Sequence, residues 1–188
     1  MDFSCLIPTN FAKTVNEWLR EDLHGFDYVG AVFGSNPQQA TLFAKSGAVM
    51  CGTPFFDMVM KEVGCEVEWL VDEGQFLPGS NTNRIAAAHV TGLARHIMLG
   101  ERLALNIIGQ ASGIATRCRK LAQLAQEEGF AGSIAATRKV TPGFRVVQKY
   151  AVIVGGCDSH RYVRMDLGSM VMLKDNAIEE CGSITAAV

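Results

Sequence analysis

The feature that most constrains the fold is an alternation of strand-like and helix-like segments in the last third of the chain. Residues 132–139 and 169–176 are short apolar runs typical of buried strands, whereas residues 144–156 have helical spacing and end at a Gly-Gly turn. Ser183 then has the character of a helix N-cap. Such repeats are typical of parallel α/β folds, so we predict the first βα units of a parallel α/β barrel. Because a closed barrel needs about eight strands, we expect the barrel to be incomplete in this chain.

The N-terminal half mixes short strand-like runs with helical segments. Residues 10–22 and 54–64 carry apolar side chains at helical spacing, and the second segment begins with a proline suited to a helix start. Residues 40–52, 65–71 and 84–92 have the alternation or the composition of strands, with a Ser-Gly turn inside the first. We therefore predict an α+β unit in which helices cover one face of a mostly antiparallel sheet.

A long helical segment, residues 93–129, connects these two regions. It is rich in Ala, Leu and Ile and ends at a glycine suited to a helix C-terminus. Gly100, Gly109 and Gly113 lie within it, and glycine inside a helix costs about 1 kcal/mol relative to alanine. We therefore expect helix breaks or a close backbone approach at these positions. The predicted domains are an N-terminal sandwich with linking helices, residues 1–110, and a partial barrel, residues 111–188.

Composition excludes several classes of protein. Hydrophobic residues make up 48% and charged residues 19%, which argues against disorder, and the net charge of −2 argues against a general nucleic-acid binder. No apolar run is long enough to cross a membrane, and the N-terminus lacks the positive charge of a signal peptide. The six cysteines form no CxxC pair and, with the histidines, no zinc spacing. We expect reduced, buried thiols in a cytoplasmic protein.

Cationic side chains gather at the ends of the two predicted strands. Arg138 and Lys139 directly follow the first strand, and Lys174 closes the second. Ligands of parallel α/β folds bind beyond the carboxyl ends of the strands. Arginine and lysine there favour an anion, so the sequence predicts a pocket for a small ligand with several negative charges, such as a dicarboxylate or a pyrophosphate.

Further cations follow in the same region. His160 and Arg161 form a pair that we also expect at the pocket. Lys149 and Arg164 are expected to be solvated surface charges. Arg145 opens the predicted helix, where the helix dipole disfavours a cation, so both a structural and a functional role stay open for it.

Longer motifs carry a resemblance to a known family: ERLALNIIGQASGIAT (101–116), TRKVTPGFR (137–145), KYAVIVGGCDSHR (149–161) and MLKDNAI (172–178). Over essentially all 188 residues, the sequence resembles the eukaryotic quinolinate phosphoribosyltransferases, or carboxylating nicotinate-nucleotide pyrophosphorylases. The resemblance implies an N-terminal open-faced α/β sandwich followed by an incomplete parallel α/β barrel. It also implies a pentosyltransferase of NAD biosynthesis that converts quinolinate and phosphoribosyl pyrophosphate to nicotinate mononucleotide, pyrophosphate and CO2.

The resemblance further implies roles for individual residues. Lys139 and Lys174 would be catalytic. Arg102 would reach the active site of a neighbouring subunit, which implies a homodimer or a higher homo-oligomer with shared sites. Mg²⁺ would accompany the sugar donor, with ligands that cannot be identified in this chain. The residues that would bind substrate are Arg102, Thr137, Arg138, Lys139, His160, Arg161 and Lys174.

The sequence also departs from the family pattern. Val140 and Ala177 replace a threonine and a histidine, and residues 163–165 form an apparent insertion between Arg161 and Lys174. The later barrel strands, which would carry the acidic residues for the ribose and Mg²⁺, are not in this chain, so we expect its remainder to lie elsewhere. Two alternatives remain: a repurposed enzyme such as a decarboxylase that acts on a pyridine carboxylate without the sugar donor, and a non-catalytic assembly partner of a full-length homologue.

Overall fold

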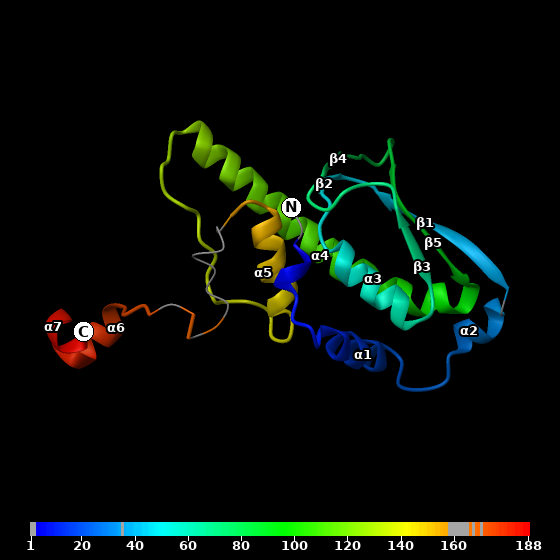
Figure 1. The fold of residues 1–188 in the computed structure, drawn as a ribbon, viewed down its shortest axis with the longest axis horizontal. Helices are drawn as coiled ribbons and strands as arrows, with labels where there is room; N and C mark the ends of the chain where they lie inside the picture. The colour runs from blue at the N-terminus through cyan, green and yellow to red at the C-terminus, as the bar shows by residue number, and fades with distance from the viewer. Residues whose placement is uncertain (1–2, 35, 158–165, 167, 170) are drawn as a thin grey trace.

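A three-stranded antiparallel sheet with helices on one face forms the N-terminal part of the molecule (Figure 1). The computed structural model describes residues 3–34, 36–157, 166, 168, 169 and 171–188. The strands lie in the order β1 (Pro37–Ala44), β5 (Ile85–Leu93) and β3 (Glu66–Trp69). The helices α3 (Thr53–Glu62) and α4 (Ala94–Glu127) pack against it. The predicted α+β unit is therefore confirmed.

Side-chain alternation explains why these segments form strands. In β3, Val67 and Trp69 are half-buried while Glu66 and Glu68 face solvent, as expected for a strand with one covered face. A second sheet pairs β2 (Gly47–Val49) with β4 (Phe76–Pro78). The predicted run 40–52 thus contributes strands to two different sheets.

The N-terminal helices complete this part of the fold. The predicted helix at 10–22 is confirmed as α1 (Phe11–Asp22), and η1 (Ser4–Leu6) precedes it. The short α2 (Tyr28–Phe33) is capped by Asp27, whose Oδ1 accepts a hydrogen bond from the Gly30 amide at 2.8 Å. This cap satisfies one of the free amides of the first helical turn.

Helix α4 is continuous over 34 residues, so the expected breaks at its glycines are absent. The close approach that was expected as the alternative is found at Gly100, because an added Cβ there would lie 3.0 Å from Val63 Cγ2. Gly109 and Gly113 instead have open space around them. Packing of the apolar face of α4 outweighs the weak helix propensity of three glycines. The predicted domain boundary between residues 110 and 111 falls inside this helix.

Helix α5 (Arg145–Val154) confirms the helix predicted at 144–156 and packs against α4. Its Tyr150 ring meets the Phe55 ring of α3 edge-on at 5.0 Å, so one core extends from the sheet to α5. Arg119 of α4 caps the C-terminus of α5, because its Nη2 donates to Val154 O at 3.1 Å and its Nε donates to Gly155 O at 3.3 Å. A cation is favourable there because the last carbonyls of a helix have no partners within it.

The two strands predicted at 132–139 and 169–176 do not form in the described residues. A strand satisfies its backbone groups through a neighbouring strand, and the described part of the chain places no strand beside either segment. The helices α6 (Asp175–Cys181) and α7 (Ile184–Ala187) stand apart from the core (Figure 1). Ser183 caps α7 as predicted, since its Oγ accepts a hydrogen bond from the Ala186 amide at 3.1 Å.

All six cysteines lie in the described residues, and none of them is part of a disulfide. Cys51, Cys65 and Cys157 are buried as expected, but the expectation is wrong for Cys5 and Cys181, which are exposed. Burial raises the pKa of the Cys51 thiol far above its usual value, and the nearby Glu73 carboxylate adds to the rise. Cys51 therefore packs as a small neutral side chain.

Candidate active site

One cavity of about 690 Å³ contains four of the predicted site residues. Thr137, Arg138 and Lys139 line it from the segment after α4, and Lys174 lines it from the residue before α6. Both segments are irregular rather than strands, yet they still meet. We call this cavity the cationic pocket; its remaining lining residues are Ala131, Gly132, Ser133, Ala135, Ala136 and Met172.

The charged residues that line the cationic pocket in the described part of the chain are all cations. They are Arg138, Lys139 and Lys174, and no described lining residue is a carboxylate. Arg138 Nε is buried and has no hydrogen-bond partner among the described residues. A buried donor without a partner costs free energy, so an anionic ligand that accepts this N–H would gain that free energy on binding. The positive charge and the buried donor therefore both favour a small anion in this pocket.

Helix α5 fixes the backbone of the residues that carry these cations. Lys149 was expected at the surface, but its side chain is 1% exposed, and its Nζ donates to Thr137 O at 2.8 Å. The expectation was wrong because a buried ammonium is tolerated where a carbonyl replaces its water. Arg145, the first residue of α5, donates from Nη1 to Arg138 O at 3.5 Å.

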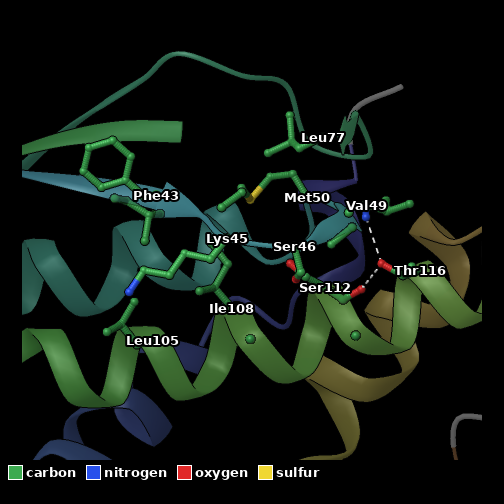
Figure 2. Close-up of a pocket in the computed structure, with 16 residues that line it drawn as sticks. Phe43, Lys45, Ser46, Val49, Met50, Leu77, Leu105, Ile108, Ser112 and Thr116 are labelled. Carbon is green, nitrogen blue, oxygen red and sulfur yellow. Dashed lines mark hydrogen bonds between the residues drawn. The ribbon is translucent and has the colours of Figure 1, made fainter. Parts of the chain in front are cut away.

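A second groove lies between α4 and the two-stranded sheet (Figure 2). It measures about 380 Å³, and Gly109 and Gly113 form part of its floor. Thr116 Oγ1 accepts a hydrogen bond from the Val49 amide at 2.8 Å and donates to Ser112 O at 2.6 Å, which ties β2 to α4. None of the predicted site residues lies in this groove.

Comparison with known proteins identifies the family. Residues 27–112 match the N-terminal domain of quinolinate phosphoribosyl transferase, and residues 114–188 match its C-terminal domain. The chain belongs to the quinolinate phosphoribosyltransferase family. It is 45% identical to the carboxylating nicotinate-nucleotide pyrophosphorylase of Rattus norvegicus over 97% of its own length, and 44% identical to that of Homo sapiens.

Solved structures agree with this assignment. The nicotinate-nucleotide pyrophosphorylase of Francisella tularensis matches 96% of the chain with a TM-score of 0.85 and 29% sequence identity. The predicted fold class is therefore confirmed at the level of the family. The chain spans 59% of the rat and human proteins and 62% of the Francisella chain.

The other predicted residues of the quinolinate phosphoribosyltransferase site are Arg102, His160 and Arg161. Arg102 lies on α4 beside a separate cavity, where its Nε is 3.9 Å from Asp22 Oδ2. His160 and Arg161 lie outside the described residues, as do Arg164 and the apparent insertion at 163–165. Their roles stay predictions.

Two side chains near the pocket were missed or misjudged from the sequence. Gln148 Oε1 accepts a hydrogen bond from the Thr141 amide at 2.9 Å, and its Nε2 donates to Thr141 Oγ1 at 3.0 Å. Gln148 and Lys149 follow Arg145 by three and four positions, the spacing of neighbours on a helix surface. Applied to the predicted helix at 144–156, that spacing could have indicated that these three side chains contact one neighbouring segment.

A metal site would need several His, Cys, Asp or Glu side chains close together in the described part of the chain. No group of three or more His, Cys, Asp or Glu side chains there could hold a metal ion. The described residues that line the cationic pocket include no carboxylate, which is the side-chain ligand that Mg²⁺ prefers. Among the same residues, no helix combines the length and apolar character needed to span a bilayer.

Proposed function

We propose that this chain carries the quinolinate-binding part of a quinolinate phosphoribosyltransferase. The enzyme would convert quinolinate and phosphoribosyl pyrophosphate to nicotinate mononucleotide, pyrophosphate and CO2. The observation that carries the proposal is the cationic pocket, where Arg138, Lys139 and Lys174 meet and no carboxylate is among the described lining residues. Quinolinate has two carboxylates on one ring, and several fixed cations would hold it in one orientation.

The chemistry that this pocket would support is electrostatic. As pyrophosphate leaves the ribose C1, the quinolinate ring nitrogen forms a bond to that carbon. The cationic ring then accepts the electron pair of the breaking C–CO2 bond, and a proton replaces CO2. We propose Lys139 and Lys174 as the catalytic cations, which would orient the carboxylates through both steps without forming a covalent intermediate.

The accompanying groups are part of the proposal. Mg²⁺ would arrive bound to the phosphates of the sugar donor, a common mode for this ion, and we derive no step through it. We propose a homodimer or a higher homo-oligomer in which Arg102, remote from the pocket of its own chain, reaches the site of a neighbouring subunit. A cytoplasmic location is supported by six cysteines that form no disulfide in the described residues, because disulfides are rare in reducing compartments.

Calorimetric titration of quinolinate into the 188-residue chain tests the proposal. We expect saturable binding and an affinity for nicotinate, which has one carboxylate fewer, that is lower by about tenfold or more. Equal affinity for the two acids, or no binding of quinolinate, would overturn it. Release of CO2 from quinolinate without phosphoribosyl pyrophosphate would instead favour the donor-independent decarboxylase.

A further inference from the structure

The 137–141 segment carries two of the pocket cations but forms no helix or strand. Within it, the Lys139 amide donates to Thr137 Oγ1 at 3.2 Å, which is a local contact and does not attach the segment to the rest of the fold. Its conformation must therefore be set from outside. The anion site depends on that conformation, since a displacement of about 1 Å at a binding group is enough to weaken a site.

Among the described residues, three side chains of α5 contact the segment, and each contacts a different residue of it. Lys149 Nζ binds Thr137 O, Arg145 Nη1 binds Arg138 O, and Gln148 binds the amide and the hydroxyl of Thr141. We call Arg145, Gln148 and Lys149 the α5 clamp. Helix α5 is itself rigidly placed, because Val147, Tyr150, Ala151 and Val154 are buried in the core.

We propose that the α5 clamp positions the 137–141 segment for anion binding, and that Lys149 is its central positioning residue. Lys149 does not line the pocket, so it acts through the Thr137 carbonyl, one peptide unit before Arg138. Its contact is the shorter of the two cation–carbonyl bonds, and Lys149 itself is buried, where a charged donor bonds more strongly than in water. The proposal deepens the proposed function and rests on it for the identity of the anion.

Hydrogen exchange and ligand binding together test the clamp. In Lys149→Met, which removes the ammonium but keeps an unbranched apolar chain, we expect amides of residues 137–141 to exchange faster than in the unaltered chain. We also expect the dissociation constant for quinolinate to rise by about tenfold, with a smaller ratio between quinolinate and nicotinate. Lys120→Met is the matched control, since Lys120 is an exposed lysine of α4, and it should change neither quantity.

Gln148→Ala provides a second variant in case Lys149→Met lowers stability too far. Gln148 is half-buried, and the two bonds described above join its side-chain amide to Thr141. Removal of this amide should therefore speed hydrogen exchange at Thr141 with little change in melting temperature. Unchanged exchange in both folded variants overturns the clamp, whatever the ligand results. Faster exchange with unchanged quinolinate affinity overturns its positioning role.

The two proposals can fail separately. If the unaltered chain does not bind quinolinate, the proposed function fails, and the exchange measurements still decide whether α5 holds the segment. If the unaltered chain binds quinolinate and Lys149→Met binds it equally well, the proposed function stands and the inference about Lys149 is wrong.

Discussion

At the residue scale, the cations around the pocket divide into two groups by their partners. Lys149 is buried and bonded to a backbone carbonyl, which stabilises its charge within the fold. Arg138 instead keeps a buried Nε without a partner in the described part of the chain. The first pattern is typical of a structural support, whereas the second agrees with the proposal that Arg138 binds a ligand. This difference leads to opposite expectations for their substitution.

Arg138→Ala should weaken quinolinate binding without weakening the fold. The loss of one or two hydrogen bonds to a charged ligand would cost about 1.5–3 kcal/mol each in binding free energy. The melting temperature should stay equal or rise, because the substitution removes a buried donor that lacks a partner. Calorimetry and thermal denaturation would measure the two effects. Arg117→Ala, at an exposed position of α4, is the control, and a loss of stability without a loss of affinity would contradict the assignment.

Asp57→Asn should make stability less dependent on pH. Partial burial raises the pKa of Asp57, the Glu73 carboxylate adds to the rise, and the hydrogen bond from Trp69 Nε1 at 2.8 Å opposes it. The folded state therefore binds the proton more tightly than the unfolded state, so this group lowers stability as pH rises from about 3.8 through the raised pKa.

Urea denaturation between pH 3.5 and pH 7 would measure this effect of Asp57. Relative to the unaltered chain, Asp57→Asn should gain stability as pH rises through that window and stay constant above it. Glu66→Gln removes one carboxylate from an exposed position of β3 and should not show the same trend. A stability difference that does not vary with pH would show that the Asp57 pKa is not raised.

At the element scale, helices with a clear apolar stripe were predicted to within a few residues. The segments 10–22, 54–64 and 144–156 correspond to α1, α3 and α5. Two short elements, α2 and β4, were not predicted, because six and three residues are too few to show a periodic pattern. The strands at 132–139 and 169–176 were wrong for another reason: apolar composition favours a strand, but pairing decides whether it forms.

The junction of α4 and α5 depends on a close approach that the sequence shows only as a Gly-Gly pair. A Cβ added at Gly155 would lie 2.5 Å from Cys118 Cβ and 2.6 Å from Ala115 O, both on α4. Gly155→Ala should therefore lower the free energy of unfolding by about 1–3 kcal/mol, because the two helices must move apart.

Gly109→Ala is the matched control for Gly155→Ala. An added Cβ at Gly109 meets no atom within 4 Å, and the position is inside α4. This variant should raise stability by about 0.5–1 kcal/mol, since alanine favours a helix over glycine. Chemical denaturation of the two variants measures both changes. If Gly155→Ala is as stable as Gly109→Ala, the close approach does not limit the packing of α5.

At the scale of the whole molecule, the sequence predicted that Lys174 lies near Arg138 and Lys139 but not what holds them there. Lys174 reaches the same cavity as Arg138 and Lys139, as expected from their positions after two segments of similar character. The barrel strands expected at 132–139 and 169–176 are missing from the described residues. Contacts from α5 hold the 137–141 segment instead. Such contacts depend on tertiary packing, and a local pattern does not determine which carbonyl a buried lysine meets.

The last part of the chain should contribute little to the stability of the rest. Neither α6 nor α7 contains a buried residue, and Ile184 and Val188 are exposed. Deletion of residues 175–188 keeps Lys174 and all of the core, so it should leave the melting temperature within about 2 °C of the intact chain, because terminal segments without burial add little to cooperative stability. Hydrogen exchange should likewise show low protection in α6 and α7 and high protection in α3. A large fall in melting temperature on deletion would mean that these helices pack on the core in solution, and the cationic pocket would then be more enclosed than its two irregular segments make it.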